Sequence, residues 1–322
     1  MRNGIAVAGS ILVDRINEIS AYPNAGELTK IHGVQLAVGG LVPNVAIDLK
    51  RMDENLEIKA LGRIGEDENS EFLMQKLTEE KIDVSCIVKG EEKTSFTEVM
   101  SVKGGQRTFF TYAGASAKFG YDDFDFDTLN VKMLHLGYFL LLDKMDAGDG
   151  EKVLKKAKEV GIQTSIDLVS ENSDRYKQVL PCLQYTDNLI INEVEAGKMV
   201  DIEPTNENLE KIARALKGYG VKERVIIHTP SISVCLSESG FTYLPSYQLS
   251  DDFIVGTTGA GDAFCAGCLI GIYRNYSDEE ILAFGSRAAT AALSSADAIS
   301  GMRNEKEIQE LCKNLTRKKI CL

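Results

Sequence analysis

The sequence Gly256-Thr257-Thr258-Gly259-Ala260-Gly261-Asp262-Ala263-Phe264 joins a glycine-rich turn to an apolar segment that continues to Tyr273. The spacing of the apolar residues predicts a buried or half-buried helix that starts near Asp262. Glycines at 259 and 261 permit a tight turn and leave the backbone N–H groups of the loop uncovered. Together with the positive end of the helix dipole, these N–H groups predict a binding site for an anion.

Asp262 stands at the mouth of this predicted anion site. A carboxylate there can accept the proton of a hydroxyl that attacks a bound phosphoryl group. The loop therefore combines the two requirements of phosphoryl transfer to an alcohol. The alternative is a glycine-rich loop in which Asp262 only caps the helix.

The composition narrows the class of protein. The chain has 322 residues, of which 44% are hydrophobic and 26% charged, as in soluble globular proteins. A net charge of −12 argues against a nucleic-acid partner, which needs basic surface. No uncharged apolar run approaches the roughly 18–20 residues of a membrane span, and Asp14 and Arg15 interrupt the apolar start before a secretion signal could form. Seven scattered cysteines fit a reducing compartment, so we expect a cytoplasmic protein.

The order of the expected elements indicates an α/β fold. The apolar run 4–13, broken by Gly9-Ser10, predicts a buried strand followed by a turn. Beyond residue 130, expected strands at 133–136, 163–168, 188–191 and 224–228 alternate with expected helices at 150–160, 175–183 and 208–217. This alternation predicts right-handed βαβ units and a parallel sheet covered by helices. A hairpin with a turn at Lys103-Gly104-Gly105 is expected within the β-rich segment 94–113.

Further sequence features accompany the 256–264 loop, which itself lies late in the chain after several βα units. They are Asp14 after the first strand, the turn Gly39-Gly40 with Asn44 in the helix that follows, the strand-to-turn segment 61–67, and Asn192-x-x-Glu195 directly after a strand. In this order and spacing the chain resembles the ribokinase-like (PfkB) family of carbohydrate and nucleoside kinases over essentially its whole length. The resemblance implies one domain, 1–322, built as a three-layer α/β/α sandwich with a mainly parallel central sheet. It also implies a small β lid, supplied by about 12–36 and 94–113.

The resemblance also implies residue roles. Asp262 matches the general base, and Gly259, Ala260 and Gly261 match the anion hole that stabilises the transferred phosphoryl group. The positions that bind acceptor hydroxyls correspond to Asp14, Gly39, Gly40 and Asn44. Asn192 and Glu195 match the motif that orders Mg²⁺ around the phosphates of ATP, with Glu195 acting through water. Further nucleotide contacts are expected at Thr258, His228 and Thr229.

Two departures from the family pattern qualify these expectations. Gly256 stands where family members often carry an Asp that helps to bind a monovalent cation, so we expect potassium to activate weakly or not at all. The segment 228–234 has no glycine where many members have a glycine-rich turn near the nucleotide, so the nucleotide contacts are expected to differ.

Other motifs favour structural roles. Cys265-x-x-Cys268 falls inside the expected apolar helix without a second ligand pair, which indicates packing rather than a redox or zinc site. The histidines His32, His135 and His228 have no ligand spacing, so no metal role is expected for them. Gly9-Ser10 lacks the remaining glycines of a dinucleotide fingerprint, and no Walker-type loop occurs.

The expected activity is ATP- and Mg²⁺-dependent phosphorylation of a primary hydroxyl of a small free sugar such as a pentose or ketose. A nucleoside is the second candidate acceptor, because the lid aromatics Phe96, Phe109, Phe110 and Tyr112 offer surfaces for a base. A sugar phosphate comes third because it requires cations, and only Lys30, Arg63 and Arg107 lie near the relevant segments. A catalytically silent sugar-binding regulator is the alternative outside the enzymes. A homodimer formed through the lid is also expected.

Overall fold

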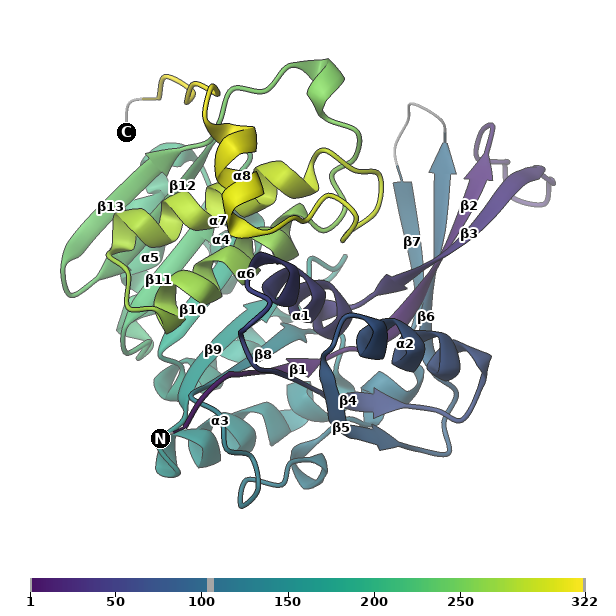
Figure 1. Cartoon of the computed structure of the whole chain (residues 1–322), viewed down its shortest axis with the longest axis horizontal. Helices are drawn as coiled ribbons and strands as arrows, with labels where there is room; N and C mark the ends of the chain where they lie inside the picture. Colours follow the sequence, from purple (N-terminus) through teal and green to yellow (C-terminus); the bar gives the residue numbers. More distant parts are fainter. Residues whose placement is uncertain (1, 103–106, 321–322) are drawn as a thin grey trace.

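A nine-stranded sheet forms the centre of the structure (Figure 1), a computed structural model that describes residues 2–102 and 107–320. The strand order is β13-β12-β11-β10-β9-β8-β1-β4-β5. The strands are β1 (Ile5–Gly9), β4 (Ile58–Ile64), β5 (Asp83–Lys89), β8 (Met133–Phe139), β9 (Gln163–Leu168), β10 (Asn188–Asn192), β11 (Arg224–His228), β12 (Ile232–Ser237) and β13 (Gly240–Pro245). Neighbours from β5 to β11 are parallel, whereas β12 and β13 add an antiparallel edge.

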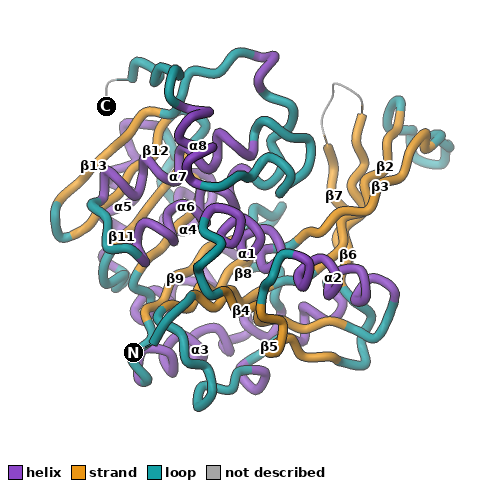
Figure 2. Tube along the Cα trace, viewed as in Figure 1, coloured by secondary structure: helices purple, strands orange, loops and turns teal. Residues whose placement is uncertain are grey.

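Helices cover both faces of this sheet (Figure 2). One face packs against α1 (Leu41–Met52), α2 (Glu68–Glu79), α6 (Ala260–Tyr273), α7 (Asp278–Ala292) and α8 (Glu305–Cys312). The other packs against α3 (Gly150–Glu159), α4 (Glu193–Val200), α5 (Leu209–Gly218) and the 3₁₀ segment η4 (Arg175–Tyr185). Each face has its own buried apolar cluster, so the predicted three-layer α/β/α fold is confirmed.

A second sheet of four strands projects from the first (Figure 1). Its order is β3 (Ile31–Gly39), β2 (Leu12–Ile19), β6 (Ser95–Val102) and β7 (Arg107–Tyr112), and we call these four strands the lid. Only Ser10 and Ile11 separate β1 in the large sheet from β2 in the lid, so the apolar start of the chain serves both sheets. The expected turn at 103–105 lies outside the described residues.

Most expected helices begin and end within two residues of their predicted bounds, but the segment near 175–183 is different. It forms a 3₁₀ helix that contains Pro181, which lacks the N–H group that an α-helix would need at this position. Short 3₁₀ turns also occur at Gly114–Lys118, Tyr121–Asp123, Asn206–Asn208 and Asp251–Phe253, and a π-helical turn at Met145–Asp149 precedes α3.

The helix α6 is apolar on all sides because it is buried between neighbouring elements. Its backbone approaches α7 closely, since a Cβ atom at Gly267 would lie 2.9 Å from the Cα atom of Gly285. Cys265 and Cys268 are buried in this helix with free thiols, as expected for packing residues. Within the described ranges, no helix is both long enough and apolar enough to cross a bilayer.

Candidate active site

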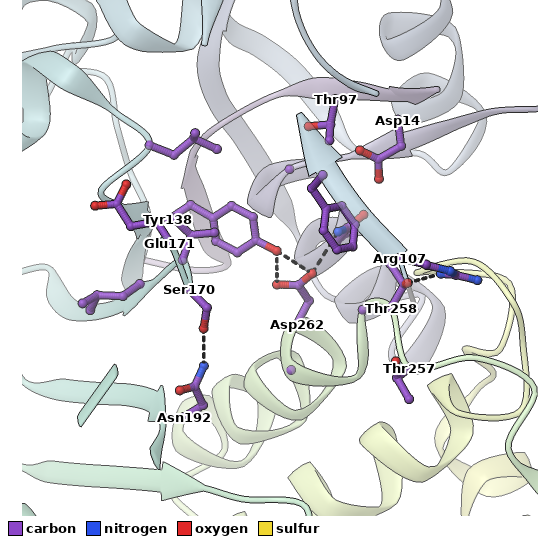
Figure 3. Close-up of a pocket in the computed structure, with 18 of the residues that line it drawn as sticks. Asp14, Thr97, Arg107, Tyr138, Ser170, Glu171, Asn192, Thr257, Thr258 and Asp262 are labelled. Atoms are coloured by element: carbon purple, nitrogen blue, oxygen red, sulfur yellow. Dashed lines mark hydrogen bonds between the residues drawn. The ribbon is translucent and has the colours of Figure 1, made fainter. Parts of the chain in front are cut away.

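A cleft of about 1370 Å³ opens between the lid and the large sheet. Its floor comes from residues at the carboxyl ends of β8 to β11, and its walls from α1, the lid and the N-terminus of α6. In open α/β sheets this edge is where ligands bind. Figure 3 shows Asp14, Arg107, Tyr138, Asn192 and Asp262 around this space.

Asp262 lies in the first turn of α6 with its carboxylate fixed by two donors. The Nδ2 group of Asn44 donates to Oδ2 at 2.8 Å, and the Tyr138 hydroxyl lies 3.0 Å from Oδ1 and 2.9 Å from Oδ2 (Figure 3). Burial and the negative charge of Asp167 raise the pKa of Asp262 from 3.8 to about 7. A carboxyl group with this pKa can accept and release a proton near neutral pH.

The loop before Asp262 has the backbone geometry of an anion site. Gly259 has φ 78°, and a Cβ atom there would lie 2.6 Å from the Cα atom of Ala298, so only glycine fits. Ala260 and Gly261 follow in the first turn of α6, where backbone N–H groups have no partner within the helix. The Ala260 N–H makes a long hydrogen bond to the carbonyl oxygen of Thr257, at 3.4 Å. Arg107 reaches this loop from the lid and donates to the hydroxyl of Thr258 (Figure 3).

The residues expected to read acceptor hydroxyls lie together on the lid side of the cleft. Burial raises the pKa of Asp14 to about 7, against the opposing effect of Arg107. Gly39 stands behind this carboxyl group, because a Cβ atom there would lie 2.6 Å from the Cγ atom of Asp14. Gly40 lines the cleft with φ 83°. The Oδ1 atom of Asn44 is buried and has no hydrogen-bond partner among the described residues, so a donor from a ligand or a water molecule would satisfy it.

Asn192 and Glu195 form the opposite end of the cleft, at the start of α4. The Asn192 Oδ1 atom accepts from the Glu195 N–H at 2.9 Å, and Glu195 Oε2 accepts from the Asn192 N–H at 3.2 Å, which is a reciprocal capping box. Ser170 donates to Glu195 Oε1 at 2.8 Å and accepts from Asn192 Nδ2 at 2.9 Å. Burial raises the pKa of Glu195 to about 8, so a nearby cation would stabilise its ionised form. An oxygen donor set with a strongly buried carboxyl group suits Mg²⁺ with retained waters.

The two residues expected near the nucleotide at the end of β11 are placed differently. His228 lines the cleft beside the anion loop, with its ring 4.8 Å from that of Phe264. Burial lowers its pKa to about 4, so its imidazole is neutral at pH 7. Thr229 is not among the described residues that line the cleft. Its hydroxyl accepts from the N–H groups of Ser231 and Ile232 and closes a tight turn.

Three residues that the sequence motifs do not assign also contribute to the site: Tyr138, Asp167 and Arg107. The only sequence signal for Tyr138 and Asp167 is their place at the ends of expected strands, where parallel sheets bind ligands. Of the three cations considered above, Arg107 alone lines the cleft; Arg63 pairs with Asp123 at 3.0 Å and Lys30 is exposed.

Gly256 lies against the loop at 295–296. A Cβ atom at position 256 would lie 2.7 Å from the carbonyl oxygen of Ser295. An Asp at this position would therefore require the backbone of the two loops to separate.

The chain has the ribokinase class of α/β fold. In this class a mostly parallel sheet lies between helix layers, and here a β lid stands over a cleft that contains a glycine-rich helix N-terminus and a buried carboxylate. The comparisons agree with this class. Residues 2–305 match the pfkB family carbohydrate kinases, and the chain belongs to this family.

Relatives differ in the compounds for which they are named. The ribokinase of Arabidopsis thaliana is 27% identical over 316 residues, which cover 96% of this chain and 81% of the relative. The adenosine kinase of Saccharomyces cerevisiae is 25% identical over 295 residues, which cover 88% of this chain and 86% of the relative. The solved structure of Arabidopsis thaliana ribokinase complexed with ribose and ATP has a TM-score of 0.82 at 23% identity, covering 97% of this chain and 99% of that one. The predicted family is therefore confirmed, and the chain is a carbohydrate or nucleoside kinase of the PfkB family.

Proposed function

We propose that this protein transfers the γ-phosphoryl group of ATP to a primary hydroxyl of a small free sugar. The observation that carries the proposal is the arrangement on α6, where the anion loop 259–261 leads directly into Asp262. A base and an anion site in the same turn of a helix suit in-line attack of an alcohol on a phosphoryl group.

In the proposed reaction Asp262 accepts the proton of the attacking hydroxyl, and Asn44 keeps the carboxylate oriented during the transfer. The N–H groups of the 259–261 loop stabilise the charge that develops on the phosphoryl oxygens. Arg107 lies beside the same loop, so its guanidinium adds positive charge at this end of the cleft. Glu195 and Asn192 would hold Mg²⁺ through its waters, and the ion would offset phosphate charge.

The acceptor is recognised by Asp14 and the unpaired Oδ1 atom of Asn44. A carboxylate accepts from two adjacent hydroxyls at once, which suits a vicinal diol next to a hydroxymethyl group, as in ribose or fructose. The second candidate is a nucleoside, because the Phe109 ring lines the cleft and offers a stacking surface. The similarity to a yeast adenosine kinase supports the same alternative.

The test is a coupled ADP-release screen over free sugars, sugar phosphates and nucleosides, with Asp262→Asn as the inactive control. Steady ADP release with a pentose or ketose is the expected result. Turnover of nucleosides alone, with kcat/KM far above that of every sugar, would establish the second candidate. The absence of turnover with any acceptor would indicate a silent sugar-binding protein and overturn the proposal.

A further inference from the structure

Tyr138 occupies an unusual position at the carboxyl end of β8. Its backbone has φ 58°, a left-handed conformation that a bulky aromatic residue rarely adopts. The Tyr138 N–H group donates to Oδ1 of Asp167 at 2.7 Å, which holds this conformation. Gly137 makes the approach of Asp167 possible, because a Cβ atom at 137 would lie 2.2 Å from the same oxygen. Backbone strain that the surroundings enforce in this way is common at functional sites.

The strained backbone directs the Tyr138 side chain toward Asp262 (Figure 3). The phenol oxygen lies within 3.0 Å of both carboxylate oxygens, at 3.0 Å from Oδ1 and 2.9 Å from Oδ2. Burial and the charges of Asp262 and Asp167 raise the pKa of Tyr138 well above its ordinary value of 10. The phenol therefore keeps its proton and donates it in a hydrogen bond to the carboxylate.

We propose that Tyr138 is a positioning residue for the base: its hydroxyl keeps the Asp262 carboxylate ionised and oriented, and Asp167 keeps Tyr138 in place. The inference rests on the proposed role of Asp262 in the reaction. Tyr138 itself needs no contact with the acceptor or with ATP for this role.

The surroundings of Asp262 explain why a second donor is needed. Four titratable groups interact with its charge: Asp167 from β9, Asp14 from β2, Asp48 from α1 and Cys265 from α6 itself. His228 from β11 and Arg107 from β7 line the same cleft, and His135 from β8 lies 3.5 Å from both Asp167 and Cys265. Asp167 and Asp14 disfavour a negative charge on Asp262, and so does burial. The hydrogen bonds from Asn44 and Tyr138 act in the opposite direction.

The experiment compares Tyr138→Phe with the wild-type protein over pH 5.5–9. Loss of a hydrogen bond to a carboxylate should raise the pKa of Asp262 by about one unit. The acid limb of the pH profile of kcat/KM for the acceptor should move to higher pH by the same amount. Turnover at pH 6 should then fall about tenfold, whereas at pH 9 it should stay within about threefold of wild type.

Tyr273→Phe is the matched control. It removes a phenol hydroxyl from the far end of the same helix, where the oxygen accepts from the Gly4 N–H at 3.1 Å outside the cleft, and it should leave the pH profile unchanged. Incorporation of 3-fluorotyrosine at position 138 provides a second variant that preserves the side-chain shape. Its more acidic hydroxyl is a stronger donor and should move the acid limb to lower pH.

A measurement that needs no acceptor separates this inference from the proposed function. The infrared difference spectrum between each protein and its Asp262→Asn counterpart isolates the carboxyl stretch of Asp262. This band reports the titration of Asp262 directly. An upward shift in Tyr138→Phe supports the inference even if the acceptor is misassigned. An unchanged titration in both position-138 variants, or a rate loss of equal factor at every pH, would overturn it.

Discussion

Asp262→Asn should abolish turnover and, at the same time, make the folded protein more stable at alkaline pH. Loss of a positioned general base lowers kcat by about 10²–10⁴-fold. The gain in stability has a different cause. Asp262 is 6% exposed and faces Asp167, so the folded chain resists ionisation of this carboxyl group.

The size of the stability gain follows from the pKa of Asp262, which rises from 3.8 in the unfolded chain to about 7 in the folded one. Because the folded-state pKa is the higher one, the contribution of this group to stability is fully present below about pH 4 and is lost as the pH rises toward 7. A shift of about three units corresponds to about 4 kcal/mol at pH 8 and less than half of that at pH 5. An Asn cannot accept from both Asn44 and Tyr138 as well as a carboxylate does, which removes about 1 kcal/mol at either pH.

The assay is urea unfolding of the wild-type protein and of Asp262→Asn at pH 5 and pH 8, together with ADP release. The stability difference between variant and wild type should increase by about 2–3 kcal/mol between the two pH values. An increase below about 0.5 kcal/mol would show that Asp262 ionises in the folded chain as easily as in water. A variant that kept more than about a tenth of the wild-type kcat would exclude Asp262 as the base.

Four further outcomes are expected. Asp14→Ala should raise the acceptor KM about tenfold or more and leave the KM for ATP unchanged, because Asp14 lines the cleft at the end where we propose that the acceptor binds. Potassium chloride at constant ionic strength should accelerate the reaction weakly or not at all, since Gly256 provides no carboxylate; a large, saturable, potassium-specific increase would refute this. Arg107→Gln should lower kcat more than it raises the acceptor KM, because the guanidinium contacts Thr258 directly before the anion loop; an effect on KM alone would place Arg107 at the acceptor instead. Phe109→Glu should convert a lid-mediated dimer into monomers and raise the acceptor KM, because Phe109 and Phe110 are 56% and 59% exposed on the lid. An unchanged mass in light scattering would exclude the lid as the interface.

The sequence predicts the sheet and the anion loop well because both depend on local patterns. Alternating apolar segments identify β8 to β11 and their helices, and the glycines at 259 and 261 identify the start of α6 to within two residues. The 3₁₀ form of η4 also has a local signal, which is Pro181. The apolar pattern around Pro181 predicts a helix but does not distinguish a 3₁₀ helix from an α-helix.

The hydrogen-bond network around the proposed base could not be predicted, because it depends on residues that are far apart in the chain. Tyr138 and Asp262 are 124 residues apart, and Arg107 and Thr258 are 151 apart. Their contacts exist only once β8, the lid and α6 are assembled. Thr229 remains a predicted nucleotide contact, but its place in the sequence does not reveal that its hydroxyl accepts from two N–H groups in a local turn.

The residues expected to bind the acceptor lie where the chain crosses between the two sheets. The chain enters the lid through Ser10 and Ile11 and returns to α1 through Gly39 and Gly40. The two crossings are tied together, because Ser10 accepts from the N–H groups of Leu41 at its hydroxyl (3.2 Å) and Val42 at its carbonyl (3.1 Å). An acceptor held by Asp14 in β2 and Asn44 in α1 would therefore bridge the joint between the sheets. Its binding free energy would depend on the lid and on α1 together, so an acceptor that reached only one of them would bind more weakly.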